Sequence, residues 1–402
     1  MNKVTVIGAG FMGNQIAHIS LLADYREVIL TDINQISLEN ALRNISNGLN
    51  WYEKNGFMKN YKSIDYFMDK LTLELNLEKA VENSDIVIEA VPEKIKVKKE
   101  IYNNLSLYAP KNTIFATNTS TMSITRIGSF YRYPENLIGI HFIPPVIERR
   151  LVEICPGEYT SEKTIRQAIK FAESLPCITG DRFIVQPNRE SPGFILNRLL
   201  IALNLYFNWL AEQALKKRIS WQELDNDFSD SEEIWGFCEL IDYIGVDVWH
   251  DVSKSFEMSL SSEFKPPLFL KDFIKNKKLG VKTGEGFFKW PKGKRTFLEW
   301  TREERPIKNK AKKAGLINLE AVFALLFNEG CKLLEEKVVN DFETIDNAIT
   351  IGTNYQLPAL YPEGKIKYKE WSEILEKLVK DTGFNYFKPC NLMKRGNFKP
   401  PR

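Results

Sequence analysis

Short apolar runs alternate with helix-like patterns over about the first 188 residues of the chain. Six runs have the length and composition of buried strands: residues 3–7, 27–31, 84–90, 113–117, 136–141 and 151–154. Between them, apolar residues recur at helical spacing, as in residues 13–22 and in the long polar stretch that ends near Phe67. Strands that alternate with helices indicate parallel strands joined by crossover helices. We therefore predict an α/β domain over residues 1–188, with a mostly parallel, doubly wound sheet.

The pattern changes after Ser191-Pro192-Gly193. A long apolar helix is expected over residues 194–215, and helical spacing dominates from there onward. Residues 291–313 are basic and poor in apolar runs, which is typical of a linker. The last helical block extends from Gly315 to about Lys380. We predict a helical domain over residues 189–290, a linker over 291–313 and a further helical domain over 314–402.

The two helical blocks resemble each other. Each begins with a long apolar helix, at residues 199–215 and 321–334, and each ends on a similar string, Phe264-Lys265-Pro266-Pro267-Leu268 or Phe387-Lys388-Pro389-Cys390-Asn391-Leu392. Repetition at a fixed spacing indicates tandem copies of one structural unit. We interpret the second block as a degenerate copy of the first, and two unrelated helical bundles remain the alternative.

Composition narrows the class of protein. Apolar residues make up 44% and charged residues 27% of the 402 residues, and the net charge is +3. This near-neutral balance argues against nucleic acid or an anionic membrane as the main partner. The five cysteines show no Cys-x-x-Cys spacing, so we expect neither a disulfide framework nor a metal site. No signal peptide and no apolar run of ~20 residues is seen, so a soluble, cytoplasmic protein is the default expectation.

A glycine-rich loop follows the first expected strand and precedes the first helix. It reads Gly8-Ala9-Gly10-Phe11-Met12-Gly13. In such a loop the first glycine permits the tight turn, the second lets a pyrophosphate approach the backbone, and the third lets helix pack on strand. The free amides at the helix N-terminus then face the phosphates. The loop predicts a dinucleotide site, against the alternative of a glycine turn without a ligand.

Asp32 lies 19 residues after Gly13, at the end of the second expected strand. A carboxylate at this place accepts hydrogen bonds from the adenosine ribose and repels a 2′-phosphate. Asp32 therefore favours NAD over NADP as the cofactor.

The motifs together resemble the L-3-hydroxyacyl-CoA dehydrogenase family over nearly the whole chain. Besides the glycine loop, the resemblance rests on residues 89–93, 116–120, 141–142, 151–153, 192–198, 239–242, 245–247 and 282–287. It implies a Rossmann NAD-binding domain followed by all-α C-terminal domains of the 6-phosphogluconate-dehydrogenase-like type, here in tandem. It also implies NAD-dependent oxidation of (S)-3-hydroxyacyl-CoA to 3-ketoacyl-CoA, as in fatty acid β-oxidation.

Oxidation of a secondary alcohol needs a base for the hydroxyl proton, and histidine is the usual one. The chain has three histidines, and of these His141 alone lies at the C-terminal end of an expected strand, where open α/β sheets bind ligands. Glu153, 12 residues later on what we expect to be the neighbouring strand, could orient the imidazole. The family resemblance gives these two residues the same roles.

Further site residues follow from the resemblance. Ser120 and Asn197 match positions that contact the substrate oxygen; a strand-end cap and a helix-start polar residue are the structural alternatives. Four more residues match positions near the nicotinamide side of the cofactor: Glu93, Lys98, Asn118 and Lys282. For the two lysines, a solvated surface charge is the alternative.

The sequence departs from the family at two places. Pro144 occupies the position of an asparagine that contacts the catalytic pair, so an amide side chain and a backbone donor are both lost. Gly48 and Asn55 stand where the family has a serine and a lysine that help hold CoA, with Lys54 and Lys59 nearby. An acyl-CoA substrate therefore has less support than NAD and the alcohol chemistry.

Three functions stay open on the sequence. The first is the 3-hydroxyacyl-CoA dehydrogenase. The second is a sister enzyme for a free 3-hydroxy acid, such as a sugar acid or carnitine, with Arg149 or Arg150 binding the carboxylate. The third is a non-catalytic NAD-binding protein, supported by Pro144. In assembly we expect a monomer, or a homodimer that uses another surface, because the second helical copy can pack against the first.

Overall fold

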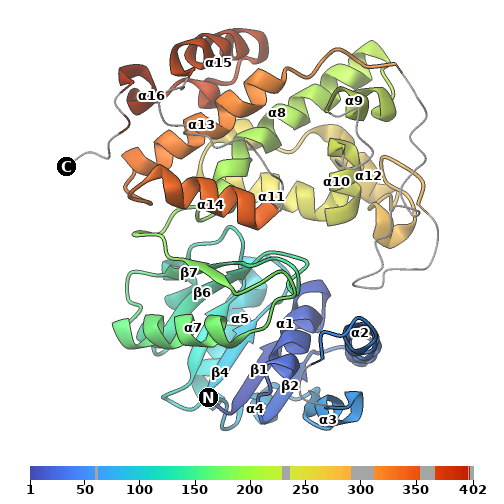
Figure 1. Ribbon diagram of the computed structural model, residues 1–402, viewed down its shortest axis with the longest axis vertical. Coiled ribbons are helices and arrows are strands. Elements are labelled where there is room, and N and C mark those ends of the chain that lie inside the picture. Colours follow the sequence, from blue (N-terminus) through green and yellow to red (C-terminus); the bar gives the residue numbers. More distant parts are fainter. Residues whose placement is uncertain (59–61, 229–235, 291–311, 354–366, 397, 399–402) are drawn as a thin grey trace. The chain divides into compact units, whose positions relative to one another are not determined.

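The structure is a computed structural model that describes residues 1–58, 62–228, 236–290, 312–353, 367–396 and 398 (Figure 1). The described chain falls into two compact units. Residues 1–196 and 337–353 form the first unit, and the other described residues form the second. The candidate catalytic pair and the glycine loop both belong to the first unit.

An eight-stranded sheet forms the centre of the first unit, in the order β3-β2-β1-β4-β5-β6-β7-β8. The neighbouring strands are parallel except for β6 and β7, which are antiparallel. The strands are β1 (Lys3–Ile7), β2 (Glu27–Thr31), β3 (Leu71–Glu74), β4 (Ile86–Glu89), β5 (Ile114–Thr117), β6 (Leu137–Phe142), β7 (Leu151–Pro156) and β8 (Phe183–Val185).

Helices cover both faces of this sheet (Figure 1). Alternate strand residues enter different cores: Ile86 and Ile88 of β4 pack with the residues of α1, α2 and α7, and Val87 packs with those of α5 and α6. The helices of the unit are α1 (Phe11–Leu22), α2 (Gln35–Lys54), α3 (Ile64–Met68), α4 (Leu77–Val81), α5 (Ile95–Tyr108), α6 (Ile124–Gly128), α7 (Glu162–Ser174) and α14 (Phe342–Thr353), with the 3-10 turn η1 (Pro134–Asn136). The predicted α/β class with a mostly parallel, doubly wound sheet is confirmed.

Side-chain caps explain where several of these helices begin. The Asn34 side chain accepts from the amides of Ile36 and Ser37 at the start of α2, and Ser161 caps α7 in the same way. Such caps satisfy amides that have no partner within the helix. By contrast, Gly10 at the start of α1 has no side chain to cap with, so the first amides of that helix are left to other partners.

The second unit is helical. It contains α8 (Leu196–Lys217), which continues from the last residue of the first unit, and then α9 (Trp221–Phe228), α10 (Phe237–Ile244), α11 (Val246–Ser259), α12 (Leu268–Lys275), α13 (Leu319–Glu335), α15 (Tyr368–Thr382) and α16 (Asn391–Arg395), with the 3-10 turns η2 (Ser262–Phe264), η3 (Val281–Thr283) and η5 (Asn385–Phe387). The order α11-η2-α12 recurs as α15-η5-α16. The two similar strings seen in the sequence therefore occupy equivalent places in the two blocks.

Ion pairs of the buried Arg198 join the two helical blocks within the second unit. Arg198 on α8 lies 3.2 Å from Glu329 of α13 and 2.6 Å from Glu336, and the Arg198 side chain is only 3% exposed. The Tyr386 hydroxyl donates to the same Glu329 carboxylate at 3.0 Å. Burial lowers the pKa of Arg198, but Glu329 and Glu336 outweigh it and raise that pKa. The second block is thus packed against the first by contacts that keep Arg198 charged.

One helix of the C-terminal region groups with the sheet. The α14 helix packs on β7 and β8, and a Cβ at Gly352 would lie 2.7 Å from Leu196 and 2.8 Å from Leu151. The predicted domain 314–402 includes α14, whereas the structure groups this helix with the first unit. Most of the predicted linker, residues 291–311, lies outside the described residues.

Candidate active site

The glycine loop connects β1 to α1 and leaves no room for a side chain at two of its positions. Gly8 has a φ of +99°, and a Cβ there would lie 2.7 Å from the carbonyl oxygen of Ala90. A Cβ at Gly13 would lie 1.7 Å from the carbonyl oxygen of Gly8. Helix and strand therefore approach as closely as the motif predicts.

Gly10 is different, because a Cβ at this position would meet no protein atom within 4 Å. The fold alone does not require glycine there. Gly10 is the N-cap of α1, and the next two residues are Phe11, which is 48% exposed, and the partly buried Met12. Open space in front of helix N-terminal amides fits a pyrophosphate group. The loop therefore fits the dinucleotide that the sequence predicts.

Asp32 follows β2 and is held at the edge of this loop. Its Oδ2 accepts a hydrogen bond from the amide of Ala9 at 2.8 Å, and its Oδ1 accepts from the amide of Asn34 at 2.9 Å. Two backbone donors thus hold the carboxylate beside the loop. A carboxylate at this place fits a ribose with free hydroxyls, as in NAD.

His141 and Glu153 lie opposite each other in the antiparallel β6–β7 pair. Their side chains meet, with Nδ1 of His141 2.6 Å from Oε2 of Glu153. Both are buried: the His141 side chain is 4% exposed and the Glu153 side chain 0%. The neighbouring strand predicted for Glu153 is the one observed, and the pair has the geometry of a base with its orienting carboxylate.

The second oxygen of Glu153 is also engaged. Its Oε1 accepts hydrogen bonds from the amides of Ile195 at 2.9 Å and Leu196 at 3.0 Å. These amides follow Phe194, whose ring centroid lies 5.6 Å from that of His141. The segment 192–198, which in sequence is only a family signature, thus fixes the carboxylate. Sequence reasoning missed this role, since nothing in a Pro-Gly-Phe string shows where the following amides point.

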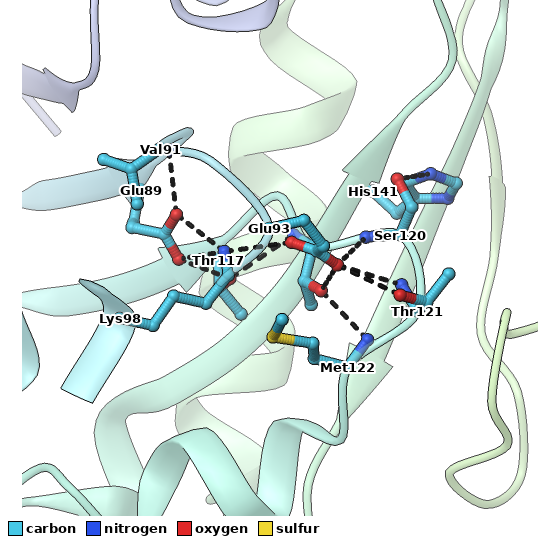
Figure 2. Close-up of polar contacts among 10 residues, drawn as sticks. Glu89, Val91, Glu93, Lys98, Thr117, Ser120, Thr121, Met122 and His141 are labelled. Carbon is cyan, nitrogen blue, oxygen red and sulfur yellow. Dashed lines mark hydrogen bonds and ion pairs between the residues drawn. The ribbon is translucent and has the colours of Figure 1, made fainter. Parts of the chain in front are cut away.

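Ser120 contacts the other side of the imidazole. Its Oγ lies 3.1 Å from Nε2 of His141, and Figure 2 shows the two side chains facing each other. With Glu153 ionised and accepting at Nδ1, the proton sits on Nδ1 and Nε2 is left as an acceptor for the Ser120 hydroxyl. The arrangement of the two partners thus suits the tautomer that can take a proton at Nε2.

Two predicted cofactor residues lie next to this group. Asn118 is buried, and its Oδ1 accepts from the amide of Phe142 at 3.0 Å. Glu93 accepts hydrogen bonds from the Thr119 hydroxyl and from the amide of Ser120 at 3.2 Å. Burial raises the pKa of Glu93, but Lys98 and the hydrogen bonds outweigh it and lower that pKa.

Lys98 has an environment unlike that of a surface lysine. Its side chain is 1% exposed, and its Nζ lies 2.8 Å from both oxygens of Glu89 and 3.3 Å from Oε2 of Glu93. Burial lowers the pKa of Lys98, but the two carboxylates outweigh it and raise that pKa. The ammonium is thus fully occupied by protein groups, which the sequence could not show.

Asn197 and Lys282 belong to the second unit. Asn197 is the residue after Leu196, in the first turn of α8. Lys282 lies in η3, where its ammonium pairs with the carboxylate of Asp247. Their roles stay predictions.

The structure shows where the residues that depart from the family pattern lie. Pro144 lies in the turn between β6 and β7, three residues after His141. A Cβ at Gly48 would lie 2.9 Å from Cε1 of the buried His18, so α2 has no room for a side chain there. The Asn55 side chain donates to the carbonyl of Trp51 at 2.8 Å, while Lys59 lies outside the described residues.

Two features are absent from the described residues. These residues contain no group of three or more His, Cys, Asp or Glu side chains placed to hold a metal ion. Within the same residues, no helix has the length and apolar character needed to cross a membrane.

Comparison with known proteins agrees with this geometry. Residues 3–178 match the sequence model of the 3-hydroxyacyl-CoA dehydrogenase NAD binding domain, and residues 193–290 match that of the C-terminal domain of 3-hydroxyacyl-CoA dehydrogenase. The chain is 31% identical over 302 residues to the mitochondrial hydroxyacyl-coenzyme A dehydrogenase of Rattus norvegicus, a match that covers 72% of this chain and 91% of the rat protein.

Solved structures show the same fold. The 3-hydroxybutyryl-CoA dehydrogenase of Escherichia coli K12 superposes with a TM-score of 0.76 at 23% identity, over 98% of each chain. A diketoreductase acting on dicarbonyl compounds gives a TM-score of 0.58 at 27% identity, over 72% of this chain and 99% of the other. By its sequence and its fold, the chain belongs to the 3-hydroxyacyl-CoA dehydrogenase family, with an NAD-binding domain over residues 3–178.

Proposed function

We propose that this protein is an NAD-dependent dehydrogenase that interconverts (S)-3-hydroxyacyl-CoA and 3-ketoacyl-CoA. The observation that carries the proposal is the buried His141–Glu153 pair, with Ser120 on the free nitrogen of the imidazole. The names of the relatives support the substrate class, because they include hydroxyacyl-coenzyme A and 3-hydroxybutyryl-CoA dehydrogenases.

The residues of the first unit supply the acid–base half of this reaction. In the oxidation, Nε2 of His141 takes the proton of the 3-hydroxyl group while carbon 3 loses a hydride and the C=O bond forms. Bound NAD supplies the hydride acceptor. Glu153 keeps the imidazole in the required tautomer and stabilises the imidazolium that results. In the reverse direction the same imidazolium returns the proton to the alkoxide.

The other site residues have supporting roles in this proposal. Ser120 and Asn197 hydrogen-bond the oxygen that gains or loses the proton. The loop residues Gly8, Gly10, Phe11, Met12 and Gly13 hold the pyrophosphate, and Asp32 holds the ribose. The nicotinamide side is assigned to Glu93, Lys98, Asn118 and Lys282.

A parallel assay tests both substrate and cofactor. Purified protein is given acetoacetyl-CoA or free acetoacetate, each with NADH and with NADPH, and absorbance at the nicotinamide band is followed. The proposal expects turnover with acetoacetyl-CoA and NADH, and slow or no turnover with NADPH. Activity on the free keto acid alone would overturn the CoA assignment, and tight NADH binding without any turnover would indicate a non-catalytic protein.

A free 3-hydroxy acid is the second candidate substrate. It is favoured by the setting of Gly48, because His18 leaves no room there for the side chain that helps hold CoA in the family. Arg149 and Arg150 are the last two residues of the loop between β6 and β7 and could bind a carboxylate. The diketoreductase relative shows that the scaffold also occurs in a protein acting on dicarbonyl compounds.

For assembly, we propose that the second helical block takes the place that a partner's helical domain would otherwise fill. The Arg198–Glu329 contact within the second unit supports this. A monomer, or a dimer through another surface, is the expected state by light scattering. A cytoplasmic location accompanies the proposal.

A further inference from the structure

The turn that carries Ser120 is attached to one carboxylate oxygen. Oε1 of Glu93 accepts from the hydroxyl of Thr119, from the amide of Ser120 at 3.2 Å, and from the amide and hydroxyl of Thr121, each at 3.3 Å. The Thr119 hydroxyl in turn accepts from the amide of Met122 at 3.0 Å. Figure 2 shows the contacts of Ser120 and Thr121 with the Glu93 carboxylate. The conformation of the turn therefore depends on where this oxygen lies.

The position of Glu93 is in turn determined by Lys98, which is itself held by Glu89. Oε2 of Glu93 lies 3.3 Å from Nζ of Lys98, which is bound at 2.8 Å by both oxygens of the buried Glu89 at the end of β4. Glu89 also accepts from the Thr117 hydroxyl at 2.7 Å and from the amide of Val91 at 2.9 Å. A buried, fully hydrogen-bonded ion pair has little freedom to move. The Lys98 ammonium, paired with Glu89, is therefore a fixed positive charge beside Glu93. The Glu93 side chain itself is 28% exposed.

We infer that Glu93 is a positioning residue that holds the turn 119–121 so that the Ser120 hydroxyl meets Nε2 of His141. The 3.1 Å contact between Ser120 and His141 is the end of a chain that starts at Glu89 and passes through Lys98 and Glu93. This role rests on the proposed function, in which His141 is the base. It goes beyond a contact of Glu93 with the cofactor, because it acts through the protein and exists before any ligand binds.

Glu93→Gln is the variant that separates these roles. The amide has one acceptor oxygen and one donor nitrogen, so it cannot serve both the turn and the Lys98 ammonium. Either the turn loses its acceptor or the NH₂ group faces Nζ. Thr119→Val is the second variant, since it removes one donor and leaves the Glu93–Lys98 ion pair in place. Glu100→Gln, at an exposed position on the same helix as Lys98, is the matched control.

The first readout needs neither substrate nor cofactor. The chain has three histidines, so carbon-labelled histidine gives three imidazole signals, and a His141 substitution assigns the relevant one. The inference expects Ser120→Ala and Glu93→Gln to shift the His141 signal in the same direction. The signals of His18 and His250 stay in place. An unmoved His141 signal in either variant would overturn the inference, whatever the substrate of the enzyme proves to be.

Kinetics give the second readout. With acetoacetyl-CoA and NADH, Glu93→Gln should lower kcat by roughly 10- to 100-fold, the scale of a small misplacement at a reacting centre. The Kd for NADH, measured by fluorescence titration, reports the contact of Glu93 with the cofactor, and the loss in kcat should be larger than any rise in this Kd. Adding Glu93→Gln to Ser120→Ala should cost little more, because both act on one contact. A raised Kd with unchanged kcat, or independent losses in the double variant, would contradict the positioning role.

Discussion

Glu153 faces His141 across the antiparallel β6–β7 pair. One of its carboxylate oxygens contacts the imidazole, and the other accepts hydrogen bonds from two backbone amides. Among the described strands this is the one antiparallel pairing. The chain reverses direction between β6 and β7, so that His141 and Glu153 are directly paired in the sheet. The contact between the two side chains is therefore a consequence of strand register and not of loop conformation.

Glu153→Gln should remove most of the activity. A glutamine can accept from the amides of Ile195 and Leu196 with its oxygen, but its NH₂ group then faces Nδ1 and forces the other tautomer. We expect kcat to fall by about 10²- to 10⁴-fold, with little change in the Kd for NADH. Glu158→Gln, on the exposed segment after β7, is the control. If Glu153→Gln keeps kcat within threefold, the orienting role is wrong.

Pro144→Asn should raise the rate. Asparagine restores a carboxamide and a backbone donor three residues after His141, at a position whose asparagine contacts the catalytic pair in the family. One added hydrogen bond to a developing charge corresponds to a gain in kcat of about tenfold. Steady-state rates with acetoacetyl-CoA and NADH measure it. An unchanged or lower kcat would show that Pro144 does not limit the rate of this protein.

The buried His18 should make the first unit sensitive to acid. Burial lowers its pKa from 6.5 to about 4 in the folded chain, so the unfolded chain binds a proton first as the pH falls. Stability is therefore lost as the pH falls below 6.5, and the loss ends below about 4. At pH 5 it amounts to about 2 kcal/mol.

Urea unfolding of the wild type and His18→Gln at pH 7.5 and pH 5 measures this effect. The difference in unfolding free energy between the two proteins should shrink by about 2 kcal/mol at the lower pH, because the variant lacks the titrating group. A difference that stays constant between the two pH values would show that His18 does not titrate in this range.

Gly48→Ser should destabilise the chain and not restore a CoA contact. A Cβ at Gly48 would lie 2.9 Å from the His18 ring, and overpacking of this kind costs about 1–3 kcal/mol. Adding His18→Ala should recover most of the loss, because it removes the ring that the Cβ would meet. Asn47→Ser, at the exposed neighbouring position on α2, is the control in thermal unfolding. Additive losses in the double variant would show that the two residues do not constrain each other.

Hydrophobic patterning was enough to predict six of the strands, and residues 3–7 and 27–31 have the bounds predicted for them. It missed β3 and β8. Three residues of β3 are half-buried and one is exposed, and β8 has three residues, so neither produces a continuous apolar run. It also missed the return of α14 to the sheet, which depends on contacts between residues far apart in sequence.

The candidate site was predictable where a motif ties residue type to strand position, as at Gly8, Asp32 and His141. Glu93 and Lys98 show the limit. The sequence marks both as charged residues of a family motif, but burial and a third charge, Glu89, decide what each can reach. These properties arise only when the ends of β4 and β5 meet α5 in the folded sheet.

The most direct test of the central claim compares the wild type with His141→Gln, using acetoacetyl-CoA and NADH as substrates and NADH fluorescence to measure cofactor binding. The account predicts that the wild type oxidises NADH and that His141→Gln loses about 10²- to 10⁴-fold in kcat while binding NADH as before. Absence of turnover in the wild type, or a His141→Gln variant with undiminished kcat, would contradict it.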